Sequence, residues 1–214
     1  MKIALIGASG FVGQNLLNEA LQRGHQVTAI VRHPEKIRVN HPNLTVVKAD
    51  VMNTPSLVPV LKGSDVVISA YNAGWQNPNL HDDFLQGSAS INNAVKQAGV
   101  KRLLVVGGAG SLEVAPGVQL VDTPQFPAEW KSGALAAREA LNILKDESAL
   151  DWTFISPAIM LEPGERTGKF RLGKDNPVFD DKGESKISVQ DLAVALLDET
   201  EKPSHIRQRF TLGY

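Results

Sequence analysis

The sequence predicts an α/β protein with a doubly wound parallel sheet, built as a single domain over residues 1–214 with a small irregular excursion near the C-terminus. Short apolar runs alternate with segments of helical periodicity along the chain. The apolar runs are hydrophobic at successive positions, as in strands that are buried on both faces. No repeat or linker interrupts this alternation, which is the pattern expected when helices cover both faces of a sheet.

The first half of the chain contains four of the expected strands. A buried strand over residues 2–6 precedes a helix whose apolar side chains recur on one face, and Gly24 ends that helix. Parallel strands need such crossover helices between them. The other elements expected in this half are strands at 26–31, 43–48 and 65–70 and a weak helix around 56–61.

The second half continues the same pattern. A helical face over residues 84–98 ends at Gly99. Ser188, with Asp191 three residues later, predicts a capping box at the start of the last helix. The stretch 157–187 is rich in Gly, Pro and charge, and we expect it to cross the active edge of the sheet without regular structure. The remaining elements are strands at 102–107, 151–156 and 209–214 and a helix at about 129–147.

The composition narrows the classes of function. Lys and Arg total 22 against 23 Asp and Glu, for a formal net charge of -1, which argues against nucleic acid as a partner. The absence of cysteine excludes disulfides and cysteine nucleophiles, and the five histidines lack metal-ligand spacing, so we expect no metal. Because no apolar stretch suits a signal peptide or a membrane span, we expect a cytoplasmic protein with no membrane partner. The sequence does not indicate an oligomeric state.

Three glycines follow the first strand at intervals of three, in the stretch GASGFVG. Gly7 would allow a tight turn, Gly10 the close approach of a phosphate, and Gly13 close packing of the helix on the strand. Because the turn lies between a strand and a helix, the pattern is typical of Rossmann-type dinucleotide binding. The alternative is a glycine-rich turn without a ligand.

The start of the first helix supplies the donors for such a site. Its first backbone N–H groups, at Phe11 and Val12, have no partner within the helix and carry the positive end of the helix dipole. The Ser9 hydroxyl could add a further donor. These groups together predict a pyrophosphate site.

The end of the second strand indicates which dinucleotide is bound. An acidic residue there would hydrogen-bond the free ribose 2′-hydroxyl of NAD, whereas an Arg would accommodate the 2′-phosphate of NADP. The strand at 26–31 ends in Arg32 and His33, with Lys36 one turn later and no acid at the strand end. We therefore expect NADP(H) in preference to NAD(H), with Arg32 as a ligand of the phosphate. The alternative for Arg32 is a solvated charge.

Several stretches resemble a known family. GASGFVGQNL, RGHQVTAIVRHPEKI and KADV resemble the atypical short-chain dehydrogenase/reductases of the NAD(P)-binding, NmrA-like group. LDWTFISPA, PGERTGKFRLG and RQRFTLGY more closely resemble the small bacterial proteins labelled NADH-flavin reductases, which are similar to biliverdin reductase B, also called flavin reductase. The resemblance extends from residue 1 to residue 214 and implies a Rossmann-type reductase.

The resemblance also implies further cofactor contacts along the ends of the strands. Asp50 and Val51 match positions beside the adenine, and the backbone of Ala70 and Tyr71 matches the segment that passes the adenosine ribose and the pyrophosphate. Asp50 could instead be a turn-former, and Pro157 could be a strand terminator. The positions implied at the nicotinamide end are Gly107 and Gly108, beside its ribose, and Ser156, Pro157 and Ala158, in a turn that meets the ring.

The usual catalytic pair is missing. Ordinary short-chain dehydrogenases carry a Tyr-x-x-x-Lys pair on the helix after the fifth strand, and here its members would fall near Trp130 and Ala134. Indole does not titrate and alanine has no polar group, so neither residue can transfer a proton. No such motif occurs elsewhere in the chain, and the catalytic residues stay unassigned.

Hydride transfer to a conjugated acceptor makes smaller demands on the protein. The cofactor supplies the hydride, water can supply the proton, and the protein mainly stacks the acceptor over the nicotinamide. Trp130, Tyr71 and Trp75 are candidate stacking surfaces, and each could equally be a structural aromatic residue. Ser111 could donate a hydrogen bond near the nicotinamide, although a loop-turn serine is the simpler description. Arg166, Lys169 and Arg171 could be cations of a lid that meets a phosphate or carboxylate on the acceptor, or could be solvated charges.

We therefore expect an NADP(H)-binding oxidoreductase that transfers hydride directly from NADPH to a small flavin-like or quinone-like acceptor. A non-catalytic, NmrA-like dinucleotide-sensing protein is the main alternative and suits the missing Tyr/Lys pair equally well. An NAD-dependent epimerase or dehydratase ranks lower, because those reactions need a positioned acid or base.

Overall fold

The main sheet has eight strands, and the computed structural model describes residues 1–214. Every predicted strand is present. Those predicted at 2–6, 26–31 and 151–156 have the expected bounds, and the others differ by a single residue at one or both ends. The strands of this sheet are β1 (Lys2–Ile6), β2 (Gln26–Val31), β3 (Leu44–Lys48), β4 (Val66–Ser69), β5 (Arg102–Val106), β8 (Asp151–Ser156), β10 (Arg171–Gly173) and β12 (Gln208–Gly213).

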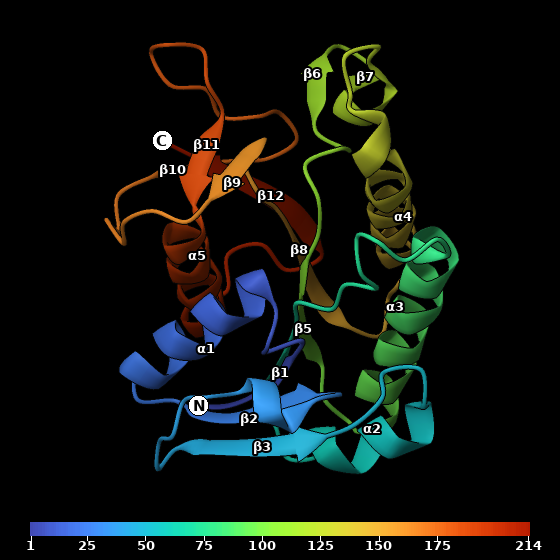
Figure 1. The fold of residues 1–214 in the computed structure, drawn as a ribbon, viewed down its shortest axis with the longest axis vertical. Helices are drawn as coiled ribbons and strands as arrows, with labels where there is room; N and C mark the ends of the chain where they lie inside the picture. Colours follow the sequence, from blue (N-terminus) through green and yellow to red (C-terminus); the bar gives the residue numbers. More distant parts are fainter.

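The order of these strands places the ligand edge. It is β10-β12-β8-β5-β4-β1-β2-β3, and all neighbouring pairs are parallel except β10 with β12 (Figure 1). The chain extends the sheet from β1 first on one side and then on the other, so the strand order reverses between β1 and β4. In doubly wound sheets the ligand crevice lies at the carboxyl ends of the strands at this point.

Helices cover both faces of the sheet (Figure 1). One face carries α1 (Phe11–Gln22) and α5 (Val189–Glu201), which pack on each other. The other face carries α2 (Thr54–Leu61), α3 (Leu80–Gln97) and α4 (Ala128–Lys145). Two short 3-10 helices, at Pro34–Lys36 and Leu120–Asp122, lie in the connections. The doubly wound α/β fold predicted from the sequence is confirmed.

Alternate residues of the central strands enter different cores. In β1, Leu5 packs with residues of α1 and α5, whereas Ala4 and Ile6 pack with residues of α2 and α3. All three side chains are almost completely buried. This two-sided burial is the reason that the strand is apolar at successive positions.

The expectation of an irregular stretch at 157–187 is partly wrong. This stretch contains β9 (Met160–Glu162) and β11 (Lys186–Ser188), which pair in parallel, and it also contains β10. Because β10 pairs antiparallel with β12, the sheet is not wholly parallel. β10 covers what would otherwise be an open edge of β12. An unpredicted hairpin also forms from β6 (Glu113–Ala115) and β7 (Val118–Gln119).

The predicted capping box at the start of α5 is half correct. Ser188 is the N-cap, and its Oγ accepts a hydrogen bond of 3.0 Å from the Asp191 N–H. The Asp191 carboxylate does not bond back to Ser188 but accepts from the backbone N–H groups of Thr167 and Gly168 and from the hydroxyls of Thr167 and Tyr214. Burial opposes ionisation of Asp191, but these hydrogen bonds outweigh it and hold the pKa of Asp191 below its ordinary value. Asp191 thus ties the 164–168 segment to α5.

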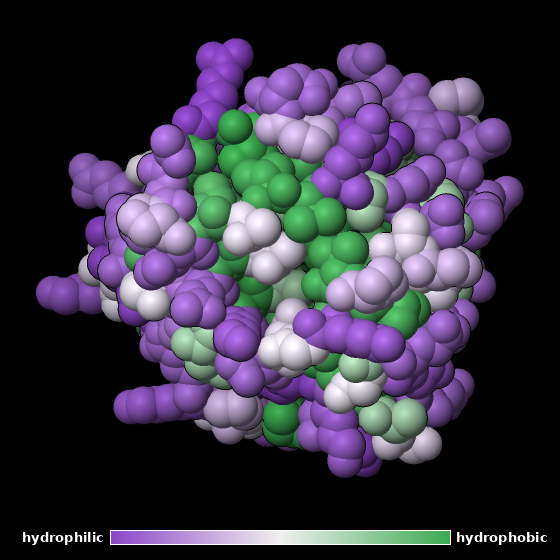
Figure 2. All heavy atoms as spheres, turned by 90° about the horizontal axis from the view of Figure 1, so that it is seen from below, coloured by the Kyte–Doolittle hydropathy of each residue, from purple (hydrophilic) through white to green (hydrophobic).

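The opposite edge of the sheet is open. β3 pairs only with β2, and Val46 on this strand is 37% exposed. Figure 2, which views the molecule from the side of β3 and α2, shows an apolar area bordered by hydrophilic residues. No helix in the protein combines the length and apolar character that a membrane span requires.

Candidate functional site

Two of the three glycines after β1 are required by the fold itself. Gly7 has φ of 78°, and a Cβ atom there would lie 2.7 Å from the carbonyl oxygen of Ala70. A Cβ atom at Gly13 would lie 1.9 Å from the carbonyl oxygen of Gly7. These positions accept only glycine because the turn, α1 and the end of β4 approach one another so closely.

Gly10 differs from its two neighbours. It is the N-cap of α1 with φ of -78°, and a Cβ atom there would meet only the Gly7 carbonyl oxygen, at an ordinary distance of 3.5 Å. The protein alone therefore has room for a side chain at Gly10. A glycine here is explained by the close approach of something outside the chain, as the sequence predicts for a phosphate.

The start of α1 presents unpaired donors beside Gly10. The first backbone bond of the helix runs from the Gln14 N–H to the Gly10 carbonyl, and the N–H groups of Phe11 and Val12 have no acceptor in the protein. No side chain caps this helix and no acidic residue lies in its first turn. The Ser9 hydroxyl makes no hydrogen bond within the chain, although the Ser9 carbonyl accepts one from the Gln14 side chain. This donor set fits an anionic group such as a pyrophosphate.

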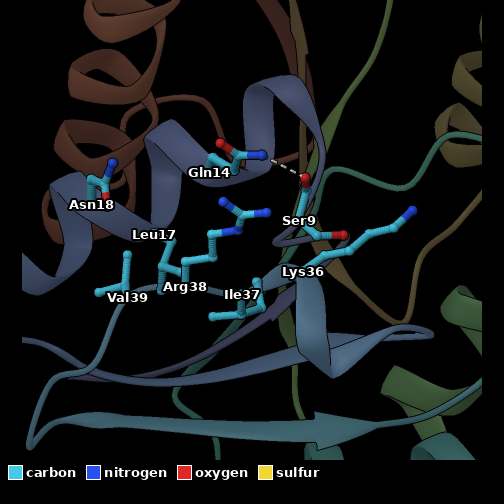
Figure 3. Close-up of a pocket in the computed structure, with 8 residues that line it drawn as sticks. All are labelled: Ser9, Gln14, Leu17, Asn18, Lys36, Ile37, Arg38 and Val39. Atoms are coloured by element: carbon cyan, nitrogen blue, oxygen red, sulfur yellow. Dashed lines mark hydrogen bonds between the residues drawn. The ribbon is translucent and has the colours of Figure 1, made fainter.

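A cavity of about 460 Å³ opens next to these donors. Figure 3 shows the Arg38 guanidinium pointing toward α1, while the Lys36 side chain passes Ser9 and extends away from the helix. The lining residues are Ser9, Gln14, Leu17, Asn18, Lys36, Ile37, Arg38 and Val39.

Three cations follow β2 without a carboxylate partner. Arg32 is exposed directly after the strand, and Lys36 and Arg38 line the cavity. The acid of this segment, Glu35, lies 3.5 Å from His33 and pairs with none of the three. Sequence reasoning missed Arg38, although its charge in the run RHPEKIR was a signal.

The segments after β3 and β4 reach the same region. Asp50 accepts a hydrogen bond of 2.9 Å from the Met52 N–H and so forms a turn, while Val51 is buried in the core. A Cβ atom at Gly7 would lie 3.1 Å from the Tyr71 backbone nitrogen, so the glycine turn and the end of β4 are in contact. The structure thus brings Ala70 and Tyr71 beside the glycine turn, and one Asp50 oxygen has a structural role.

The Tyr71 side chain is not a free stacking surface. Its ring is parallel to that of Phe84 with centroids 5.8 Å apart, and it lies against Gly87 of α3. Its hydroxyl donates a 3.0 Å hydrogen bond to the carbonyl of Asp83. Burial, followed by the charge of Asp83, raises the pKa of Tyr71 to about 12, so the phenol stays protonated near neutral pH. The contacts with Phe84, Gly87 and Asp83 give Tyr71 a structural role, which was the alternative to stacking on an acceptor.

The end of β5 lies against α4. A Cβ atom at Gly108 would meet the Ala137 side chain at 3.6 Å, and one at Gly110 would meet the Ala134 side chain at 2.9 Å. Ala134 therefore faces the β5 loop, where an ordinary enzyme of this type would place its Lys. Trp130, one helical turn earlier, is 51% exposed. Neither position holds a group that can transfer a proton.

The end of β8 contains a buried polar cluster that sequence reasoning missed. Arg209 of β12 is almost fully buried, and its guanidinium donates to Ser111 Oγ at 2.9 Å, to Ser156 Oγ at 3.1 Å and to Asp175 Oδ1 at 3.0 Å. Pro157 follows this cluster and is buried. Ser111 therefore anchors the β5 loop to β12, a structural role in line with the description of Ser111 as a loop serine.

The expected lid cations have structural partners. Arg166 donates to both carboxylate oxygens of Glu19 on α1, at 2.7 and 2.8 Å, and this contact is the main cause that lowers the pKa of Glu19. Arg171 donates to the carbonyls of Phe179 and Tyr214. Arg166 and Arg171 are thus engaged within the protein, so they match neither the free lid cations nor the solvated charges considered from the sequence, and a role for Lys169 stays a prediction.

Comparison with known proteins identifies the family. The family model described as NAD(P)H-binding matches residues 7–202. The chain belongs to this NAD(P)H-binding family. The Bacillus subtilis protein YwnB is 41% identical over 215 residues, which cover 99% of this chain and 98% of YwnB. The predicted kinship with the atypical short-chain dehydrogenase/reductases of the NmrA-like group is confirmed.

Two solved structures show the range of descriptions given to relatives of this NAD(P)H-binding protein. A Bacteroides thetaiotaomicron protein described as a "putative epimerase" is 51% identical, with a TM-score of 0.94 over 100% of this chain and 96% of that chain. A Streptococcus pneumoniae protein described as a "putative NADH-flavin reductase" is 37% identical, with a TM-score of 0.87 over 100% of this chain and 99% of that chain. The fold is shared by relatives assigned to different reactions.

Proposed function

We propose that this protein is an NADPH-dependent reductase that delivers hydride to a small flavin-like or quinone-like acceptor without a protein acid or base. The observation that carries the proposal is the lack of a Tyr-x-x-x-Lys pair on α4: Ala134, near which its Lys would fall, lies against the β5 loop at Gly110, and Trp130 precedes Ala134 by one helical turn. The relative from Streptococcus pneumoniae supports the flavin class of acceptor, since it is described as a "putative NADH-flavin reductase".

The residues present fit a dinucleotide along the edge of the sheet. The N–H groups of Phe11 and Val12 would hold the pyrophosphate, with Gly10 giving it room. When bound, NADPH supplies a hydride at its nicotinamide ring. The remaining positions proposed along the cofactor are Asp50 and Val51 at the adenine, the backbone of Ala70 and Tyr71 at the ribose and pyrophosphate, and Gly108 and Pro157 at the nicotinamide end.

The preference for NADPH rests on the charges after β2. A 2′-phosphate adds negative charge to the adenosine ribose, and Arg32, Lys36 and Arg38 offer positive charges that no carboxylate neutralises. The unbonded Ser9 hydroxyl lines the same cavity. No acidic residue stands at the end of β2 to hydrogen-bond the free ribose hydroxyl of NADH.

The proton required by the reduced acceptor would come from water. Tyr71 holds its proton, with a pKa of about 12, and its hydroxyl is committed to the Asp83 carbonyl. A flavin or quinone delocalises the incoming charge, so it does not need a strong acid at the moment of hydride transfer. The contribution of the chain is then to hold two rings in contact and to exclude other orientations.

The test is a pair of titrations followed by an acceptor panel. We expect NADPH to bind more tightly than NADH, and we expect NADPH oxidation on addition of FMN, FAD or a quinone. Tight NADPH binding without turnover across the panel would instead support a dinucleotide-sensing protein. Tighter binding of NADH would refute the assignment of Arg32, Lys36 and Arg38 to the 2′-phosphate.

An epimerase is the competing enzyme class, because the relative from Bacteroides thetaiotaomicron is described as a "putative epimerase". NAD-dependent epimerisation requires a group that takes and returns a sugar hydroxyl proton while hydride moves to and from the nicotinamide. Trp130 and Ala134 supply none, and the Tyr71 hydroxyl is bonded to the protein. We therefore rank the epimerase below the reductase. Turnover of nucleotide sugars without net NADPH oxidation would reverse this ranking.

A further inference from the structure

Two of the three tryptophans expose most of an indole at the carboxyl edge of the sheet. Trp75, in the segment after β4, is 59% exposed, and Trp130, in the first turn of α4, is 51% exposed. Trp152 is buried against α4 in the core. Exposed indoles that fill no core space are typical of binding surfaces, because their large flat faces lose water when a ligand covers them.

The indole of Trp75 packs on the N-terminal part of α4, the helix that carries Trp130. A Cβ atom at Gly133 would lie 2.7 Å from Cζ3 of Trp75, so the indole of Trp75 rests directly on the backbone of Gly133. Gly133 is three residues after Trp130 on this helix. Only glycine at position 133 leaves room for the Trp75 ring, and both exposed indoles are thus held at the same end of α4.

This indole pair stands at the proposed nicotinamide end of the cofactor. Trp130 is four residues before Ala134, on the face of α4 that packs against the β5 loop at Gly110. The segment that carries Trp75 begins at Tyr71, whose backbone touches the glycine turn at Gly7. The pair thus occupies the rim between the glycine turn and the end of β5.

We propose that Trp75 and Trp130 form the acceptor-binding wall and select flat, conjugated rings over small aliphatic carbonyl compounds. This inference rests on the proposed function and names the residues that would recognise its second substrate. Two exposed indoles at the same end of α4 offer faces for stacking, which tolerates differences in ring substituents. They offer no group that could hold or protonate a small carbonyl, because indole only donates a hydrogen bond.

A binding experiment tests the wall without turnover. FMN is titrated into the protein and tryptophan emission is followed, with free N-acetyltryptophanamide as the correction for absorption by FMN. We expect FMN to quench the exposed indoles and to leave the emission of buried Trp152 largely unchanged. Binding to the variants is read from FMN fluorescence anisotropy, which needs no tryptophan as reporter. The variants Trp75→Leu and Trp130→Leu should each weaken FMN binding, and the double variant should lose the saturable rise in anisotropy.

A kinetic experiment separates recognition of the acceptor from the other steps. Each Leu variant should raise the KM for FMN by roughly tenfold to a hundredfold, while Trp130→Phe, which keeps a ring, should recover much of the loss. Gly133→Ala keeps both indoles but displaces Trp75, so it should raise the same KM. Ile143→Ala is the control, because Ile143 is 49% exposed on the same helix about 20 Å from Trp130. This variant should leave the KM for FMN unchanged.

The outcomes distinguish this inference from the proposed function. Unchanged thermal unfolding and NADPH affinity in the Leu variants would show that the fold and the cofactor site are intact. A saturable rise in FMN anisotropy that persists in the double variant, or unchanged KM values in both Leu variants, would overturn the wall while leaving the reductase in place. Saturable quenching in a wild-type protein that turns over no acceptor would retain the wall and refute the reductase.

Discussion

Gly13 and Gly7 approach so closely that a Cβ atom on Gly13 would lie 1.9 Å from the Gly7 carbonyl oxygen. Gly10, between them, would meet the same oxygen at 3.5 Å. In the sequence the three glycines are evenly spaced, and the spacing does not distinguish one position from another. In the structure two of them serve the fold, and only Gly10 leaves space that the chain itself does not use.

This difference predicts opposite consequences for two alanine substitutions. Gly13→Ala should lower the free energy of unfolding by about 3 kcal/mol or more, because backbone atoms must move to admit the methyl group. Gly10→Ala should change the stability by no more than about 1 kcal/mol, yet weaken NADPH binding about tenfold or more. Urea unfolding and an NADPH titration of both variants check this. Wild-type NADPH affinity in Gly10→Ala would show that the phosphate lies elsewhere.

The cations after β2 predict a selective loss of NADPH affinity. Arg32→Ala and Arg38→Ala should each weaken NADPH binding by about 1.5–3 kcal/mol if they hydrogen-bond the 2′-phosphate, and should leave NADH binding nearly unchanged. The loss should shrink at high salt as the charges become screened. Titrations with both dinucleotides at two ionic strengths measure this, with the exposed Lys145→Ala on α4 as the control. Equal losses for NADPH and NADH would contradict a phosphate site.

Much of the fold could be predicted because the signals were local. β1, β2 and β8 are mostly apolar runs bounded by charged residues, glycine or proline, so their limits can be read from five or six letters. β9, β10 and β11 have three residues each and no recognisable period. Their pairing depends on partners far along the chain, as in the register of Arg171 with Gly213. A local pattern does not carry that information.

The candidate site was predictable to the same degree. The glycine turn and the charges after β2 lie in one continuous segment. The structure brings Ser9 of that turn together with Lys36 and Arg38 around one cavity. The direction of the Tyr71 ring was not predictable, because it depends on Phe84 and Gly87 of a different element. Arg209 was missed for the same reason, since its partner Ser111 lies 98 residues away in the chain.

Asp191 predicts a specific dependence of stability on pH. Its pKa in the folded protein is lowered from the ordinary value of 3.8, so ionised Asp191 stabilises the fold above that pH. The contribution is lost as pH falls below 3.8 toward the lowered value. Asp191→Asn should therefore cost about 2–3 kcal/mol at pH 7, and this difference from wild type should shrink in acid.

Unfolding by urea at pH 7 and at pH 3 measures the change for Asp191→Asn. The exposed Asp181→Asn is the matched control and should have little effect at either pH. A stability difference for Asp191→Asn that stays constant between the two values would mean that the carboxylate charge does not hold the 164–168 segment.

Arg209 and Asp175 form an ion pair whose two side chains differ in burial. This difference predicts how strongly the loss of Asp175 lowers the free energy of unfolding. The Arg209 side chain is 5% exposed and the Asp175 side chain is 63% exposed. Removing Asp175 leaves a buried guanidinium without its counter-charge, whereas an exposed carboxylate alone returns to water at little cost. Asp175→Asn should therefore lower the free energy of unfolding by about 1–2 kcal/mol, more than a typical exposed acid.

A double-mutant cycle isolates this effect. Once Arg209→Met has removed the buried charge, adding Asp175→Asn should lower the free energy of unfolding by less than about 0.5 kcal/mol. The coupling energy between the two residues should therefore be about 1 kcal/mol or more. Urea unfolding of the two single variants and the double variant measures that coupling, and Asp181→Asn in the same backgrounds shows the cost of losing an uncoupled acid. Additive losses would mean that Asp175 is an ordinary surface charge. Ser111 and Ser156 alone would then stabilise the buried guanidinium of Arg209.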